Sequence, residues 1–282
     1  MIVPAGSSSG APPAKPLAGR RVLVTRAAGQ SAGLVEQLQA RGAVVIEVPL
    51  LAIALPANPR PFHDAIRAID GYDWLLLTSA NAAHAVANAI GARPETGDAH
   101  ANGAAGGRLP PTLRVASSGP ATTAVIRSVF PGTPITAQAT SRFGSPGLAE
   151  ALALVNLSGS RVLLPVSDRS PAAIAQTLGK RGAAVDVVVA YRTIVAEQAG
   201  PDLRAALDQG IDVVTFASPS AVEAFVDLRG IPRNATAVVI GPTTAAAATA
   251  AGLDVADMAD PETSEGLADA VVRCLSNTRK KP

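Results

Sequence analysis

The sequence predicts an α/β protein with two doubly wound parallel-sheet domains, and three observations lead to this fold class. Apolar residues make up 48% of the 282 residues and charged residues only 16%, so each domain can bury a core. Short apolar runs alternate with stretches of helical periodicity, which is typical of parallel strands buried on both faces. The order of these elements in the first half of the chain then recurs in the second half.

The first predicted elements form a strand–helix–strand unit. RVLVT (21–25) is a short apolar strand, and residues 30–41 carry leucine and valine at helical spacing. Gly42 is expected to end this helix, because glycine adopts the left-handed conformation of a helix end at low cost. A second strand region follows at 44–53, and this order predicts a parallel crossover.

The alternation of strands and helices continues through the first half of the chain. The glycine-rich segment 97–111 has low complexity and is expected to be a surface loop. The other predicted elements are a helix at 61–69, a strand at 74–77, a helix at 79–90, a strand at 114–117, a turn and helix over 119–130 and a helix at 145–154.

Four blocks of the first half recur in the same order in the second half. Residues 22–48 align with 162–188 at a constant offset. The offset shrinks later, because the glycine-rich loop occurs in the first copy alone. The sequence therefore indicates an internal duplication of one alternating unit. The other matched blocks are 73–86 with 212–225, 118–126 with 240–248 and 145–155 with 263–273.

Composition argues against several classes of protein. A net charge of +2 and an aromatic content of 3% do not suit nucleic-acid binding, which uses basic stripes and stacking rings. The single cysteine, Cys274, permits no internal disulfide, and no apolar run is long enough to span a membrane. Residues 1–17 are expected to be a flexible tail without a secretory signal, and 277–282 a second tail. We expect a cytoplasmic protein.

Polar residues gather directly after the predicted strands in both copies. In an open parallel sheet, ligands bind beyond the carboxyl ends of the strands. Small hydroxyls and glycines at helix starts present backbone N–H groups to anions, although Ser, Thr and Asn also cap helices without any ligand. The set expected to hold a carboxylate-rich ligand is Thr25, Arg26, Thr78, Ser79, Asn81, Ser118, Gly119, Thr122, Ser167, Ser218, Ser220, Gly241, Thr243 and Thr244.

No cofactor or metal is expected from the motifs. No GxGxxG follows a strand, and no Walker A pattern occurs, so a dinucleotide-dependent enzyme is a third choice. His63, His84 and His100 lack the spacing of metal ligands, and one cysteine cannot build a metal site.

Several motifs in order resemble those of the uroporphyrinogen-III synthase family. They include VLVTRAAGQ (22–30), DWLLLTSANAA (73–83), VVAYRT (188–193), FASPSAV (216–222) and IGPTTA (240–245). The resemblance implies a lyase of tetrapyrrole (haem) biosynthesis. Such an enzyme cyclises and dehydrates hydroxymethylbilane, a linear tetrapyrrole polycarboxylate, and inverts its last pyrrole ring without a cofactor.

The resemblance also implies how the chain divides. It would cross between the domains twice, so that 18–53 and 194–276 form the first domain and 56–190 the second. The two connecting segments, near residues 52–57 and 189–195, would pair as a short ribbon hinge, with the substrate bound between the domains. We expect a monomer that binds neither nucleic acid nor membrane.

Tyr191 is the candidate for a specific catalytic role. Its hydroxyl could donate a proton or a hydrogen bond to the leaving hydroxyl of the substrate. Equally, it could be a tyrosine that packs at the hinge with its hydroxyl in water. The alternative function is a non-catalytic two-domain sensor or binding protein for small molecules, which an added DNA-binding segment, membrane segment or export signal would have favoured.

Overall fold

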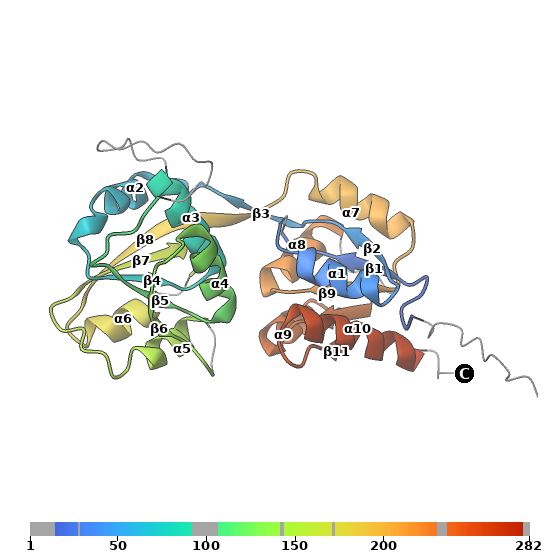
Figure 1. Ribbon diagram of the computed structural model, residues 1–282. Helices are drawn as coiled ribbons and strands as arrows, with labels where there is room; N and C mark the ends of the chain where they lie inside the picture. Colours follow the sequence, from blue (N-terminus) through green and yellow to red (C-terminus); the bar gives the residue numbers. More distant parts are fainter. Residues whose placement is uncertain are drawn as a thin grey trace, which may run out of the picture. The chain divides into compact units, whose positions relative to one another are not determined.

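The described residues of the computed structural model form two compact units. They are residues 15–27, 29–91, 107–141, 144–170, 173–229 and 236–278. Unit 1 combines the chain up to Ala52 with the chain from Ile194, and unit 2 is the continuous segment Ile53–Thr193. Both units alternate strands with helices, as predicted (Figure 1).

Unit 1 contains a parallel sheet in the order β11-β10-β9-β1-β2. Its strands are β1 (Arg21–Val24), β2 (Val44–Glu47), β9 (Val213–Phe216), β10 (Thr236–Val239) and β11 (Asp254–Met258). Its helices are α1 (Ala32–Ala40), α7 (Ala199–Asp208), α8 (Pro219–Arg229), α9 (Pro242–Ala250) and α10 (Ser264–Thr278).

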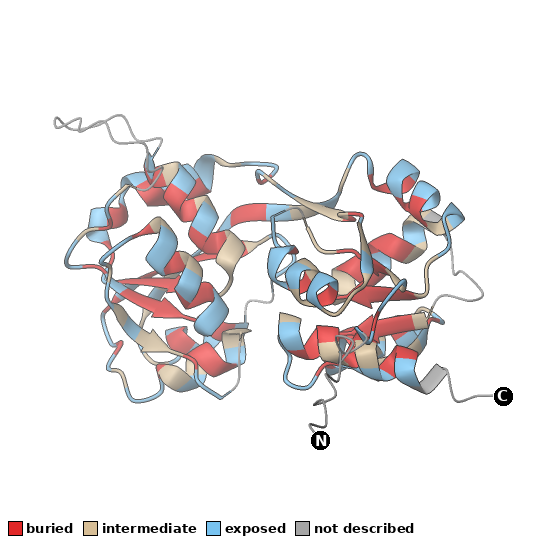
Figure 2. Cartoon of the chain, turned by 45° about the vertical axis from the view of Figure 1, so that its right-hand side comes forward, coloured by how far each residue is buried: buried red, intermediate tan, exposed pale blue. Residues whose placement is uncertain are grey.

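Helices cover both faces of the unit 1 sheet. Successive side chains of a strand point to opposite faces, so Leu23 of β1 enters the core made with α7, α8 and α9. Its neighbours Val22 and Val24 enter the core made with α1 and α10. Figure 2 shows buried residues concentrated in the strands, with exposed residues on the outer faces of the helices.

Unit 2 contains a sheet in the order β3-β8-β7-β4-β5-β6, in which β8, β7, β4, β5 and β6 are parallel. Its strands are β3 (Leu51–Ala54), β4 (Trp74–Leu77), β5 (Arg114–Ser117), β6 (Ile135–Gln138), β7 (Arg161–Ser167) and β8 (Ala184–Val195). Its helices are α2 (Arg60–Arg67), the 3-10 turn η1 (Ile69–Gly71), α3 (Ala80–Gly91), α4 (Pro120–Val129), α5 (Gly144–Ala151) and α6 (Ala173–Gly179).

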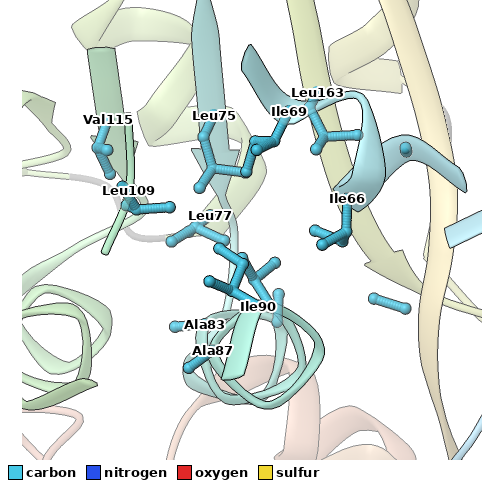
Figure 3. Close-up of a cluster of buried hydrophobic side chains, with 14 of the residues drawn as sticks. Ile66, Ile69, Leu75, Leu77, Ala83, Ala87, Ile90, Leu109, Val115 and Leu163 are labelled. Atoms are coloured by element: carbon cyan, nitrogen blue, oxygen red, sulfur yellow. The ribbon is translucent and has the colours of Figure 1, made fainter. Parts of the chain in front are cut away.

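Unit 2 is doubly wound in the same way. Leu75 and Leu77 of β4 pack on α3, where Figure 3 places them over Ala83 and Ala87. Trp74, the first residue of β4, enters the opposite core with α5 and α6. The predicted fold class of two doubly wound domains is therefore confirmed.

Two segments of chain connect the units, and they are hydrogen-bonded to each other. β3 and β8 are neighbours in the sheet. The Ala196 N–H, directly after β8, donates to the Leu50 carbonyl at 3.0 Å, and Nε of Arg192, on β8, donates to the Leu55 carbonyl at 3.0 Å. The predicted pairing of two connecting segments is confirmed.

The two sheets have the same order when the sequence repeats are superimposed. β1, β2, β9, β10 and β11 of unit 1 correspond to β7, β8, β4, β5 and β6 of unit 2. Matched contacts follow: the Arg21 N–H donates to Asp212 Oδ2 at 2.7 Å, and the Arg161 N–H donates to Asp73 Oδ2 at 2.8 Å. Each unit therefore combines the start of one repeat with the end of the other.

Three elements were not predicted, and one was divided. They are β6, β11 and α7. The two strands lie at sheet edges and have no buried residue, so they give no apolar run to detect. The expected strand at 44–53 is split into β2, which lies in unit 1, and β3, which joins the sheet of unit 2.

The expected flexible tail and the expected surface loop each have a packed end. The tail was expected to reach Leu17, but Leu17 is fully buried and its N–H donates to the Arg41 carbonyl at 2.9 Å. The loop expected at 97–111 includes Leu109, which is buried in the core with α3. An apolar side chain among glycines and prolines gives no periodicity to detect. Residues 1–14, 92–106 and 279–282 lie outside the described residues.

Candidate active site

The carboxyl edge of the unit 2 sheet brings Tyr191 to Ser79. Tyr191 lies on β8, opposite Ser167 of β7, and Ser79 follows β4 on the far side of β7. The two hydroxyl oxygens are 3.0 Å apart, and Ser79 Oγ also accepts the N–H of Ala82 at 3.1 Å. Tyr191 is 8% exposed as a whole residue, and its hydroxyl has Ser79 Oγ as a hydrogen-bonding partner.

The turn between β5 and α4 forms a second polar group on this edge. The hydroxyls of Ser118 and Thr122 are 3.1 Å apart, and both residues are buried. Gly119 has φ +152°, a conformation that favours glycine, and it precedes α4 without a side-chain cap. Gly119 has no side chain to cap the backbone N–H groups of the first turn of α4, which suits an anion-binding helix end.

The other predicted residues of unit 2 lie in the same two regions or after β7. Thr78, in the β4–α3 turn, and Asn81, in the first turn of α3, are half-buried. Ser167 ends β7, and its hydroxyl lies 2.9 Å from that of Ser170 in an exposed local turn. Unit 2 therefore presents hydroxyls and backbone amides, with one phenol, along a single sheet edge.

The carboxyl edge of the unit 1 sheet carries the second predicted set. Ser218 Oγ accepts the Ala221 N–H at 3.2 Å and caps α8, and Ser220 is half-buried beside it. Gly241 precedes α9 without a side-chain cap, as Gly119 precedes α4. Thr243 is exposed in the first turn of α9, whereas Thr244 is buried.

Thr25 has a structural place that its position after β1 did not predict. It is fully buried, and Oγ1 donates to the Thr215 carbonyl of the neighbouring strand at 2.8 Å. Thr215 Oγ1 in turn donates to the Leu23 carbonyl at 3.0 Å. The hydroxyl of Thr25 thus lies inside the sheet, bonded to the neighbouring strand.

Arg26 is the cation of this edge. It is half-buried, and burial lowers the pKa of its guanidinium, which nevertheless stays charged at neutral pH. Its Nη1 donates to Ser264 Oγ at 3.1 Å, the one partner found for it among the described residues. Ser264 begins α10, and a helix N-terminus is itself positive. An anion would offset both charges.

The start of α10 was missed as part of the candidate site. Thr263 Oγ1 accepts the Gly266 N–H at 3.1 Å and caps the helix, while Ser264 contacts Arg26. These residues follow β11, the edge strand that was not predicted. The signal that could have revealed this helix start is Thr263, because threonine is a preferred residue at the N-cap of a helix.

The described residues contain no group of three or more His, Cys, Asp and Glu side chains that could hold a metal ion. In the same part of the chain, no helix is long and apolar enough to cross a membrane. The two edges offer hydroxyls, backbone amides, the Arg26 guanidinium and the Tyr191 phenol, and the Glu262 carboxylate lies beside Gly241.

Solved structures of the same fold exist. A uroporphyrinogen-III synthetase from Helicobacter pylori has a TM-score of 0.59 at 14% identity, covering 90% of this chain and 99% of that chain. A mutant uroporphyrinogen III synthase from Thermus thermophilus has a TM-score of 0.56 at 17% identity, covering 92% and 100%. At such identities these likenesses establish the fold.

Sequence comparisons establish the family. A uroporphyrinogen-III synthase from Synechococcus elongatus is 34% identical over 217 residues, which is 76% of this chain and 76% of that protein. The family model described as uroporphyrinogen-III synthase HemD matches residues 32–269. The predicted resemblance is confirmed, and the chain belongs to the uroporphyrinogen-III synthase family.

Proposed function

We propose that this protein is a lyase that cyclises hydroxymethylbilane, with loss of water and inversion of the last pyrrole ring, to the type III isomer. Membership of the family carries this proposal. The polar edges support it, because a tetrapyrrole with many carboxylates suits uncapped helix ends and a half-buried guanidinium. Membership of an enzyme family argues against the alternative of a binding protein without activity.

The first chemical step is departure of the hydroxyl group. The C–O bond of the hydroxymethyl group breaks, the pyrrole nitrogen supplies electrons, and the oxygen leaves as water after accepting a proton. Tyr191 is proposed as the donor of this proton. Its buried phenol is held by β8 on one side and by Ser79 on the other, so it has a defined direction.

The second step requires control of geometry. The cationic carbon must be attacked through the substituted position of the last ring, giving a spiro intermediate that fragments and recloses with that ring inverted. On reclosure the unsubstituted carbon of the last ring forms the new bond and then loses its proton. This loss balances the proton donated at the start. No strongly activated nucleophile is needed, so positioning by many weak contacts supplies most of the catalysis.

Finer parts of the proposal concern the protein itself. We propose a cytoplasmic monomer that needs no cofactor, with domains at 18–53 with 194–276 and at 56–190. The units Met1–Ala52 with Ile194–Pro282, and Ile53–Thr193, support these limits.

The decisive experiment supplies the purified protein with freshly prepared hydroxymethylbilane and identifies the isomers formed. We expect the type III isomer without added metal or nucleotide. A blank without enzyme gives the type I isomer. The proposed function is wrong if the protein yields only the isomer of the blank.

Arg26 provides a second test of the same function. Arg26→Gln should raise KM about 10- to 100-fold, the equivalent of one charge-assisted contact of about 1.5–3 kcal/mol. Arg20→Gln is the matched control. Arg20 lies just before β1, at the end of the strand opposite to Arg26, and pairs with Asp212 at 2.9 Å. Equal effects of the two changes would show that Arg26 does not bind substrate.

A further inference from the structure

Three groups form a continuous hydrogen-bonded chain at the edge of unit 2. The Ala82 N–H, in the first turn of α3, donates to Ser79 Oγ at 3.1 Å. Ser79 Oγ then lies 3.0 Å from the hydroxyl oxygen of Tyr191. The chain leads from the positive end of a helix to the phenol proposed above as proton donor.

Counting protons shows which direction suits catalysis. A serine hydroxyl has one proton and two lone pairs. One lone pair of Ser79 accepts the Ala82 N–H, and its proton has the phenolic oxygen of Tyr191 within reach. If Ser79 donates to Tyr191, the phenolic proton is directed away from Ser79 and is available to a ligand.

The same direction strengthens the phenol as a donor. Hydrogen bonds in a chain polarise one another, and each hydroxyl that accepts a bond donates more strongly in turn. The dipole of α3 favours negative charge near its N-terminus, so it stabilises the developing charge on the phenolic oxygen.

The other repeat shows what the cap does without the phenol. Ser218 corresponds to Ser79 and caps α8 through the Ala221 N–H at 3.2 Å. Leu51 stands where the other repeat has Tyr191, so this cap has no phenol to act on. Capping therefore accounts for a serine at both positions, and the contact with a phenol is an added feature of Ser79.

We propose that Ser79 is a positioning residue that donates its proton to the Tyr191 oxygen and so directs the phenolic proton to the leaving hydroxyl. This inference rests on the proposed function. Ser79 is not itself the acid, since the proton that leaves with the hydroxyl comes from Tyr191. The tyrosine recovers a proton when the free ring carbon loses one at closure.

The experiment is a double-mutant cycle on the full-length protein. Ser79→Ala should lower kcat about 3- to 10-fold with KM changed less than 2-fold, as expected for one neutral hydrogen bond. In the Tyr191→Phe background, Ser79→Ala should cost less than 2-fold, because its partner is gone. Ser79→Thr keeps a hydroxyl and should retain kcat within about 2-fold.

Ser218→Ala separates capping from positioning. It removes the same kind of cap, so its effect on melting temperature should match that of Ser79→Ala. Its effect on kcat, whatever its size, should be the same in the Tyr191→Phe background as in the otherwise unaltered protein. Should Ser79→Ala fail to fold, Ser79→Gly removes the hydroxyl with little loss of capping.

The outcomes distinguish the two proposals. Equal fold-changes from Ser79→Ala with and without the Tyr191 hydroxyl would overturn the positioning role, as would a fully active Tyr191→Phe. Either result leaves the proposed function standing as long as the unaltered protein makes the type III isomer. Absence of that isomer from the unaltered protein overturns the function, and the role of Ser79 with it.

Discussion

At the level of single residues, the end of α1 shows how backbone conformation selects an amino acid. Gly42 has φ +94°, and its N–H donates to the Gln39 carbonyl at 2.9 Å. A Cβ at this position would lie 2.7 Å from Cβ of Lys15. Gly182, at the matching place in the other repeat, has φ +85°. The same residue thus ends the same helix in both units.

Gly42→Ala should lower the free energy of unfolding by about 1–2 kcal/mol, because the left-handed conformation is strained for a side chain. Gly33→Ala is the control: Gly33 lies within α1, and a Cβ there meets nothing within 4 Å. That change should stabilise by about 0.5–1 kcal/mol. Urea unfolding measures both, and stabilisation by Gly42→Ala would contradict the explanation.

Tyr72 gives the protein a pH dependence at high pH. Burial, together with the hydrogen bond and the charge of Asp186, raises the pKa of Tyr72 to about 12. The Tyr72 hydroxyl donates to Asp186 Oδ2 at 2.7 Å, and ionisation would abolish this bond. Arg161 lies over the ring and opposes the shift in pKa.

The pH range follows from the direction of this shift. A raised pKa means that folding favours the neutral phenol, so the stabilisation is full below pH 10, the ordinary pKa of tyrosine. It is lost as the pH rises from 10 towards 12. Unfolding free energy measured over this range should fall more steeply for the unaltered protein than for Tyr72→Phe. Parallel curves would rule out the contribution of Tyr72.

At the level of elements, the pairing of β1 with β9 uses two buried threonines. Thr25 and Thr215 each donate to a carbonyl of the opposite strand. Thr25→Val should therefore cost about 0.5–1.5 kcal/mol of unfolding free energy, the net worth of one hydrogen bond. KM should stay the same, because the hydroxyl is enclosed by the sheet. A raised KM with unaltered stability would instead show that the Thr25 hydroxyl contacts the substrate.

Central strands could be predicted from the sequence and edge strands could not. β4 and β5 have the predicted limits, Trp74–Leu77 and Arg114–Ser117, because each is an unbroken run that is mostly buried. β11 alternates exposed and half-buried residues, so it has no apolar run. The α10 cap and Ser264, which contacts Arg26, were overlooked for the same reason, since they follow that strand.

For the whole molecule, the repeat in the sequence is not the folding unit. The first repeat contains β1 and β2, and in unit 1 β1 pairs with β2 on one side and with β9 from the second repeat on the other. Unit 2 is continuous, from Ile53 to Thr193, and holds its own cores on both faces of its sheet. Continuity along the chain and completeness of the core therefore favour unit 2 as an independent domain.

A polypeptide of residues 53–193 should fold alone and unfold cooperatively on heating. Trp74, the single tryptophan, is buried in unit 2 and reports this transition by fluorescence. A polypeptide of residues 21–157, which is one repeat, should remain unfolded as a monomer, because β1 lacks its partner β9 and the β1–β2 pair lacks the rest of its sheet. A folded monomer of 21–157 beside an unfolded 53–193 would reverse this assignment.

The sequence alone determined the fold class, the duplication, the central strands and the polar residues that follow them. These properties are local, since apolar runs and helix-starting residues act over a few positions. Only the tertiary structure decided that Tyr191 meets Ser79 across β7, and that the Thr25 hydroxyl turns into the sheet. Such contacts join residues more than a hundred positions apart. The two repeats have the same local pattern, so the pattern cannot specify which strand pairs with which.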